Sequence, residues 1–278
     1  MSLLTVVLLT YNHEPTIGRA FDSILEQRTD FDFVIYVLED CSTDGTAAIC
    51  KSYKDRFPEK ITLFLNEKNL GVTNNIKQGL LKVKSKYYAF LEGDDYWCHA
   101  EKLQKQVDAM ENFPGCIMCG HNTLFRDLVT HKDWLFVERD MEDRRNIYSL
   151  EENLPIHLSA RLYRNCIDLT DVPAYMLLDK TSYMLYLTKG NLFYIDEVMS
   201  VYNKTGEGYW SARSRKKRRL MSLHLRYGIN KYFNFTYEGE YYQNSKLLKC
   251  TKSLLGTKLG WKVFFYLESF RLHAKYLF

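Results

Sequence analysis

The sequence predicts an α/β fold with a mostly parallel sheet flanked by helices, and three observations support this class. Short, nearly continuous apolar runs recur at residues 4–9, 33–38, 61–65 and 87–91. The segments between these runs have apolar residues at helical spacing. Polar or acidic residues follow each run. Such alternation is typical of parallel strands joined by right-handed crossovers, with ligands bound beyond the carboxyl ends of the strands.

Each of the three helices expected between these strands follows from an apolar stripe. The stripes are Ile17, Ala20, Phe21, Ile24 and Leu25 in the first segment, Ala47, Ala48, Cys50 and Tyr53 in the second, and Ile76, Leu80, Leu81 and Val83 in the third. A stripe of this kind gives a helix one apolar side that packs on a sheet. A fourth amphipathic helix is expected at roughly residues 99–112.

Carboxylates gather after the fourth strand, where FLEGDDYW contains Glu92, Asp94 and Asp95. One Asp at this position can cap the helix that follows, but a cap accounts for neither the second Asp nor Glu92. Like charges this close repel one another unless solvent, a helix N-terminus or a cation offsets them. Carboxylate oxygens suit Mg²⁺ or Mn²⁺, so a divalent cation is the expected cofactor.

The sequence after the first strand argues against two kinds of nucleotide loop. It reads TYNHEPTIG, where a dinucleotide-binding fold would have GxGxxG. A sugar nucleotidyltransferase would have a Gly-x-Gly loop with Lys or Arg there to bind triphosphate, and this loop is missing as well. An acidic site that binds phosphates needs a cation between the two groups of negative charge.

Length and composition fit either one large domain or one domain plus a small appendage. The chain has 278 residues, of which 46% are hydrophobic, enough for a full core. Seven cysteines without framework spacing indicate reduced thiols, and CIMC with His121 nearby is interpreted as a half-buried strand rather than a zinc site. No leader precedes the first strand and no apolar stretch reaches the roughly 18 residues of a membrane span, so a cytoplasmic location is expected.

Four motifs in order resemble the family 2 nucleotide-sugar glycosyltransferases, which have the Rossmann-like GT-A fold. The motifs are VVLLTYNHEPTIGRAFDSIL, VLEDCSTDGT, NLGVTNNIKQGL and KYYAFLEGDDYW, with KLQKQVDAMENFP after the last. The resemblance is close over residues 3–115 and looser to residue 212. It implies a domain at 1–212, with a nucleotide-binding half at 1–115 and an acceptor-binding half at 116–212, followed by a helical, basic extension at 213–278.

The resemblance implies a site for a UDP-sugar donor. Thr10 and Tyr11 would flank the uracil, and Asp40 would accept the proton of its N3. Asp94 and Asp95 would reach the ribose and the metal that bridges the diphosphate. The donor candidates are Thr10, Tyr11, Asn12, Glu14, Asp40, Asn75, Glu92 and Asp94, and the metal candidates are Asp94 and Asp95. Taken singly, these residues also fit ordinary roles as helix caps, a packing aromatic and first-turn polar residues.

The second motif departs from the family's common DDGS form. It reads Glu39-Asp40-Cys41-Ser42, so the second acid is retained, the first is lengthened and the glycine is replaced. Glu92 likewise stands where many members have Asp.

Asp179 is the predicted catalytic base. It precedes the strand expected at residues 193–202 by the distance at which relatives have an acid, although the residue before it is Leu178. The surrounding sequence YMLLDKTSYMLYLTK predicts a largely buried helix that Asp179 interrupts, and a carboxylate is rarely buried without a partner or a task. Asp168 and Asp171 are the alternative bases, and the alternative for Asp179 itself is an ordinary exposed or first-turn acid.

The acceptor side is predicted from two further segments that resemble the family. IHLSARLYRN gives His157 and Ser159 as acceptor candidates. YNKTGEGYW resembles a loop that closes on the diphosphate and gives Lys204 as a candidate, although the His of many relatives is missing there. A plain surface loop is the alternative for the second segment.

The tail is strongly basic. Residues 211–278 contain 15 Lys/Arg and 3 Asp/Glu, a net charge of +12, which leaves −8 for the rest of a chain of +4. The run at 215–219 predicts either a solvated helix face or a contact with an anionic membrane surface. Nucleic acid is not an expected partner, because no recognised nucleic-acid module accompanies the run.

These features and the family resemblance together imply a cytoplasmic, metal-dependent, inverting hexosyl- or N-acetylhexosaminyltransferase. A peripheral position on the inner face of the plasma membrane is the alternative to a purely cytoplasmic one. The enzyme would move a sugar from a UDP-sugar, or a related donor, to a hydroxyl of a glycan or lipid-linked glycan in capsule, lipopolysaccharide or other surface-polysaccharide synthesis. Mn²⁺ or Mg²⁺ would neutralise the leaving diphosphate. The alternatives are a sugar nucleotidyltransferase and a non-catalytic nucleotide-sugar-binding protein.

Overall fold

The computed structural model describes residues 2–138, 145–152, 154–205, 213–234 and 253–275. Contacts divide the chain into two compact units, Met1–Lys204 and Thr205–Phe278. Each unit is described by itself. The boundary expected after residue 212 falls at the end of 206–212, which lie outside the described residues.

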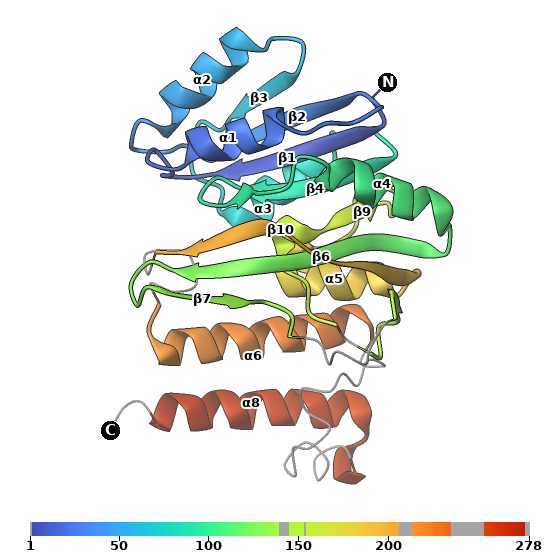
Figure 1. The fold of residues 1–278 in the computed structure, drawn as a ribbon. Helices are drawn as coiled ribbons and strands as arrows, with labels where there is room; N and C mark the ends of the chain where they lie inside the picture. The colour runs from blue at the N-terminus through green and yellow to red at the C-terminus, as the bar shows by residue number, and fades with distance from the viewer. Residues whose placement is uncertain (1, 139–144, 153, 206–212, 235–252, 276–278) are drawn as a thin grey trace. The chain divides into compact units, whose positions relative to one another are not determined.

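The first unit is built on one large mixed sheet (Figure 1). Its strand order is β3-β2-β1-β4-β9-β6-β10-β5. Its first half consists of β1 Leu4–Thr10, β2 Phe33–Glu39, β3 Ile61–Leu65 and β4 Tyr87–Glu92, all parallel to their neighbours. Strands β2 and β3 extend to one side of β1, whereas β4 lies on its other side. The gap between the ends of β1 and β4 is therefore the point where the strand order reverses, the usual place for a ligand in such a sheet.

The second half of the sheet has mixed directions. Its strands are β5 Tyr96–Trp97, β6 Cys116–Asp127, β7 Lys132–Leu135, β8 Ile147–Tyr148, β9 Leu162–Arg164 and β10 Asn191–Lys204. The short β9 is antiparallel to both β4 and β6, and it joins the two halves. Strand β10 is parallel to β6 and antiparallel to β5 and β8, and β7 is antiparallel to β6. The predicted strand at 193–202 corresponds to β10.

The helices of this unit are α1 Ile17–Leu25, α2 Thr46–Arg56, α3 Val72–Leu80, α4 Lys102–Asn112 and α5 Asp179–Leu187, with 3₁₀ turns η1 Leu158–Ala160 and η2 Ala174–Leu177. Helix α1 buries four of the five residues of its predicted stripe, and Leu25 packs against the same core. Two stripe positions differ: Ala48 on α2 and Leu81 after α3 are exposed.

One predicted helix is replaced by two elements. The segment at 175–189 forms η2, then an extended Leu178 with φ −71° and ψ 164°, and then α5. The expectation of a single buried helix interrupted by Asp179 is wrong, because α5 begins at Asp179.

Two glycines allow close approaches that place the strand ends. A Cβ on Gly79 of α3 would lie 2.1 Å from Cδ1 of Leu38, so only glycine lets α3 pack this closely on β2. A Cβ on Gly93, after β4, would lie 2.6 Å from Nδ1 of His13. The turn after β4 therefore packs directly on the loop after β1.

The second unit contains α6 Arg215–Tyr232 and α8 Thr257–Lys275. Leu223 of α6 packs with Trp261 and Phe264 of α8 in a small apolar core. Ser214 caps α6 by accepting a hydrogen bond from the amide of Lys217. Within the described part of the chain, no helix has the length and apolar character needed to cross a membrane.

Candidate active site

Asp40, directly after β2, organises the loop that follows β3. Its carboxylate accepts hydrogen bonds from Asn66 Nδ2 at 2.9 Å, Leu70 N at 2.8 Å and Gly71 N at 2.9 Å, and the residue is only 3% exposed. Asn66 also donates to Oδ1 of Asn75 at 3.0 Å. The structure thus joins Asp40 and Asn75 through Asn66, a residue that the sequence interpretation did not single out although it follows a strand.

The loops after β1 and β2 are joined by the other predicted donor residues. Oδ1 of Asn12 accepts from the amide of Thr43 at 2.8 Å, and Oε2 of Glu14 accepts from the amide of Gly45 at 2.8 Å. Thr10 is buried at the end of β1, whereas Tyr11 is exposed beside it. Asn12 and Glu14 therefore hold the two loops in place, and Tyr11 has an aromatic ring open to solvent.

The two departures from the DDGS motif have local structural roles. Oε1 of Glu39 accepts a hydrogen bond from the amide of Ser42 at 2.7 Å, which closes the turn after β2. Cys41 has φ +61°, a left-handed conformation that is strained for residues other than glycine. The chain thus keeps the backbone conformation that a glycine would adopt easily.

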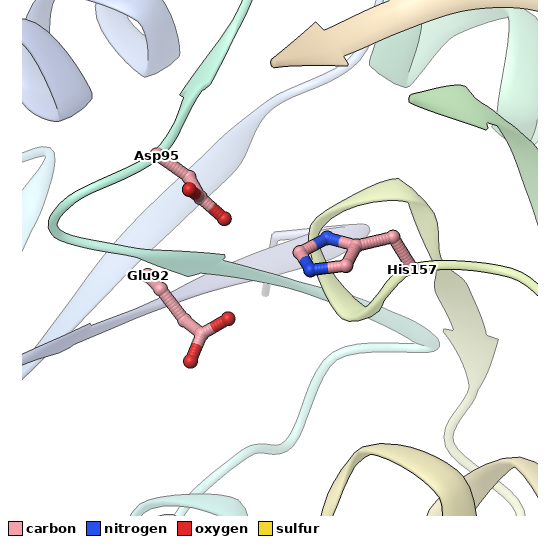
Figure 2. A group of neighbouring side chains, drawn as sticks. All are labelled: Glu92, Asp95 and His157. Carbon is pink, nitrogen blue, oxygen red and sulfur yellow. The ribbon is translucent and has the colours of Figure 1, made fainter. Parts of the chain in front are cut away.

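Three side chains converge at the carboxyl end of β4. Glu92 ends the strand, Asp95 follows the turn, and His157 precedes η1; one ligand atom from each lies within 4.8 Å of the others (Figure 2). Oδ1 of Asp95 accepts from the amide of Asn203 at 3.2 Å, while Oδ2 is buried and has no hydrogen-bond partner among the described residues. Asp94 is not part of this group, and its Oδ1 lies 3.8 Å from Nε2 of His13.

The group carries unfavourable negative charge. Burial raises the pKa of Glu92 to about 8, with further contributions from the charges of Asp94 and Asp179. Burial and the same kind of repulsion, from Asp94 and Glu92, raise the pKa of Asp95 well above its usual range. Burial also lowers the pKa of His157 to about 4, which keeps the imidazole neutral and able to bind a metal.

A divalent cation fits these residues. An unpaired buried carboxylate oxygen is costly, and a cation ligated there would remove that cost. Two carboxylates and one imidazole suit Mn²⁺ better than Mg²⁺, which prefers oxygen ligands. The structure thus groups Asp95, a predicted metal residue, with Glu92, predicted on the donor side, and with His157, predicted on the acceptor side.

Asp179 lies at the same edge of the sheet. Its charge acts on both Glu92 and His157, and its carboxylate forms an ion pair with Arg161. The side chain is 57% exposed, so the expected burial of Asp179 is wrong; the first turn of α5 directs it to solvent. Among the alternatives, Asp168 accepts a hydrogen bond from the amide of Thr170, a local turn contact.

The remaining predicted residues have mainly internal partners. Ser159 is fully buried, and its Oγ lies 2.8 Å from Nδ1 of His157. This contact orients the imidazole. Nζ of Lys204 lies 2.7 Å from Oδ2 of Asp127. Most of the predicted diphosphate loop after Lys204, residues 206–210, lies outside the described residues.

Comparison with solved structures first defines the fold. The chain matches S. aureus TarS in complex with UDP-GlcNAc with a TM-score of 0.58 at 18% identity, over 91% of this chain and 78% of that chain. It matches mannosyltransferase PcManGT from Pyrobaculum calidifontis, in complex with GDP-Man and Mn²⁺, with a TM-score of 0.57 at 16% identity, over 84% and 64% of the two chains. The fold is that of GT-A glycosyltransferases, as predicted.

Sequence comparison then gives the family. The model of glycosyl transferase family 2 matches residues 5–168, more than half of the chain. The chain belongs to this family, which confirms the resemblance predicted from its motifs.

Three relatives illustrate the family's range. Rv1520 of Mycobacterium tuberculosis is 29% identical over 220 residues, 78% of this chain and 63% of that protein. The Escherichia coli UDP-Glc:alpha-D-GlcNAc-diphosphoundecaprenol beta-1,3-glucosyltransferase WfaP is 32% identical over 111 residues, 40% and 42% of the two chains. The putative teichuronic acid biosynthesis glycosyltransferase TuaG of Bacillus subtilis is 32% identical over 108 residues, 39% and 42% of the two chains. Each match spans less than two thirds of the relative's length.

Proposed function

We propose that this protein is a glycosyltransferase that uses a divalent cation and a UDP-sugar, and transfers the sugar with inversion to a hydroxyl of a glycan or lipid-linked glycan. The observation that carries the proposal is the buried Oδ2 of Asp95, which lacks a hydrogen-bond partner among the described residues and lies with Glu92 and His157 at the end of β4. A bound Mn²⁺ or Mg²⁺ would neutralise the charge of the leaving diphosphate.

The donor pocket in this proposal lies between the ends of β1, β2 and β4. Tyr11 stacks on the uracil, and Asp40 accepts the proton of N3 through the lone pairs that its loop contacts leave available. Similar proteins support a nucleotide-sugar donor: the TarS structure contains UDP-GlcNAc, and WfaP uses UDP-Glc by name.

Asp179 is the proposed general base. Attack by an acceptor hydroxyl in line with the leaving diphosphate inverts the anomeric carbon, and the hydroxyl must lose its proton as it attacks. The exposed carboxylate of Asp179 is within electrostatic reach of Glu92 and His157, on the edge of the sheet where the donor would end. Arg161 fixes its orientation from the buried side.

The acceptor and the location of the protein are proposed from the second unit and from the relatives. On α8, Leu259, Tyr266 and Phe270 are exposed and recur at helical spacing, and Lys258 and Lys262 are exposed near them. Such a face fits the surface of an anionic membrane. WfaP acts by name on a diphosphoundecaprenol-linked sugar, so we infer a cytoplasmic enzyme of surface-polysaccharide synthesis at the inner membrane face.

Calorimetry tests the donor site. UDP should bind with Mn²⁺ or Mg²⁺ present and lose at least about ten-fold in affinity with a chelator, because the phosphates then face uncompensated carboxylates. CMP and GDP serve as controls for recognition of the uracil ring. Equal UDP affinity with metal and with chelator would contradict the metal role.

Product analysis separates the enzyme classes. Incubation with UDP-glucose and UDP-N-acetylglucosamine should release UDP in a metal-dependent reaction that is slow with water alone. A sugar nucleotidyltransferase would instead form pyrophosphate from UTP and sugar phosphate. A non-catalytic protein would bind the UDP-sugar and release no UDP.

A further inference from the structure

Three aromatic side chains form a row across the sheet beside the carboxylates. Trp134 of β7 pairs in register with Phe125 of β6, and Phe125 pairs with Tyr202 of β10. Residues paired in this way project from the same face of a sheet. The ring centroids of Trp134 and Phe125 are 5.5 Å apart, and those of Phe125 and Tyr202 are 4.5 Å apart. We call these three residues the aromatic row.

The inner end of the aromatic row reaches the carboxylates. The ring of His157, a member of the candidate metal group, lies 4.8 Å from that of Tyr202 and 5.5 Å from that of Phe125, between centroids. Burial, followed by the negative charges of Asp95 and Glu92, raises the pKa of the Tyr202 phenol. The aromatic row therefore begins where the sugar would be transferred.

The outer end of the row is open. Trp134 is 39% exposed, and the aromatic row thus continues from the carboxylates to solvent. One ion pair flanks it on the same face of the sheet, that of Lys204 with Asp127, at 2.7 Å. Nζ of Lys204 lies 6.0 Å from the centre of the Trp134 ring.

This combination matches the chemistry of a pyranose ring. A pyranose has an apolar face of C–H groups, which packs on an aromatic ring, and a rim of hydroxyls, which exchange hydrogen bonds with charged side chains. A purely lipid contact would leave the ion pair of Lys204 and Asp127 without a role, whereas a sugar uses both the rings and the charges.

We propose that the aromatic row binds a pyranose ring of the acceptor, with Trp134 as its outer platform. The proposal rests on the proposed function, because it takes the acceptor to be a glycan. It adds a binding subsite that extends from His157 and Tyr202 outward, so that the acceptor would lie along β6 and β7 with its reactive end at the carboxylates.

Indole NMR provides the test. The chain has four Trp residues, and loss of one indole N–H signal in Trp134→Phe identifies Trp134. The protein with UDP and Mg²⁺ is titrated with methyl β-D-glucopyranoside and with the methyl glycoside of N-acetylglucosamine. The Trp134 signal should shift and saturate with a pyranoside, and should not shift with mannitol, which has the same kinds of hydroxyl but no ring.

Variants complete the test. Trp134→Ala should weaken pyranoside binding at least five-fold, Trp134→Phe should retain most of it, and Phe113→Ala, which removes another exposed ring, should leave it unchanged. Ligand-observed saturation transfer gives these affinities, and an unchanged UDP affinity shows that the fold is intact. The proposal would be overturned if the indole signal of Trp134 did not shift with either pyranoside. A shift caused only by anionic vesicles would also overturn it, because it would indicate a lipid contact.

The experiments can contradict the proposed donor site and the proposed aromatic row independently of each other. Pyranoside binding without metal-dependent UDP binding would leave the aromatic row in place and contradict the donor site. Metal-dependent UDP binding, with pyranoside affinity that is the same in Trp134→Ala as in the wild type, would contradict the aromatic row alone.

Discussion

Arg161 and Asp179 form an ion pair in which the cation is buried and the anion is exposed: Nη2 and Oδ1 are 2.5 Å apart, and the side chains are 4% and 57% exposed. Arg161 also donates to the carbonyl oxygens of Ile156 and Asp179. A buried guanidinium thus ties the start of α5 to the segment that leads into His157. Asp179 keeps the part of its carboxylate that faces solvent available for an acceptor.

Asp179→Asn is expected to lower UDP release from the preferred UDP-sugar by a factor on the order of a hundred or more, because asparagine cannot act as a general base. The asparagine oxygen can still accept from Arg161, so UDP affinity should stay near the wild-type value. Steady-state UDP release and calorimetry measure the two quantities. Asp171→Asn is the matched control, an exposed acid of the same segment; if it abolishes release while Asp179→Asn does not, Asp171 is the base.

Asp95→Asn is expected to preserve or raise the melting temperature without metal and to lower the UDP affinity with metal. In the metal-free protein the buried Asp95 is repelled by Asp94 and Glu92, so removing its charge should leave the melting temperature unchanged or raise it. With Mn²⁺, the UDP affinity should fall by about ten-fold or more, because a ligand is lost.

Thermal melting in EDTA and calorimetry with Mn²⁺ check both halves of this prediction. Asp108→Asn is the matched control, since Asp108 is an exposed acid on α4 and lies outside the metal group. A lower melting temperature in EDTA together with an unchanged Mn²⁺ effect would show that Asp95 is a structural residue.

Lys102→Met is expected to change how stability depends on pH. Lys102 is fully buried, its Nζ donates to Oε1 of Gln106 at 2.7 Å, and burial lowers its pKa from 10.5 to about 7. Between these values the unfolded chain holds a proton that the folded chain has lost, so stability from this group rises with pH, by at most about 1.4 kcal/mol per pH unit.

Urea unfolding at pH 7, 8 and 9 measures the effect. The free energy of unfolding of the wild type should increase relative to that of Lys102→Met across this window. Lys105 lies on the same helix but is paired with Glu197 at 2.5 Å. The free energy of unfolding of Lys105→Met should therefore change with pH in the same way as that of the wild type. If the free energy of unfolding of Lys102→Met also changed with pH in the same way as that of the wild type, Lys102 would stay charged in the folded state.

The exposed face of α8 should bind anionic membranes. Tyr266 and Phe270 are 70% and 75% exposed, and Tyr266→Glu and Phe270→Glu should each weaken cosedimentation with phosphatidylglycerol vesicles by about five-fold, since each places a negative charge at the surface. High salt should weaken the binding of the wild type. Leu65→Glu, in the first unit, is the control, and equal binding by all variants would exclude α8 as the contact.

The parallel half of the sheet was predictable because local pattern determines it. Strands of a parallel sheet covered by helices appear in the sequence as nearly continuous apolar runs, and the four predicted runs differ from β1 to β4 by at most one residue at an end. The antiparallel β9 and β5 were not predicted. They have three and two residues, too few for a period, and packing across the sheet fixes them, as in the stacked rings of Tyr88 and Tyr163, 4.9 Å apart.

The candidate site was predictable only where its residues share one motif. Glu92 and Asp95 stand together in the sequence, whereas His157 joins them from a distant segment with no spacing signal. Asp179 was predicted in a buried position because the apolar residues on both sides of it suggested one helix. The extended backbone of Leu178 separates two elements there, and side-chain periodicity does not report such a break.

The contacts of Asp40 have a kinetic consequence. Its carboxylate already accepts three hydrogen bonds from the loop at 66–71, so the ordering of that loop is completed when the chain folds. A nucleotide that binds beside this loop therefore does not need to rearrange it, and the loop loses little conformational entropy on binding. Diffusion and the removal of water from the pocket then determine the rate of UDP association. In stopped-flow experiments, association should occur in a single phase whose observed rate constant rises linearly with UDP concentration.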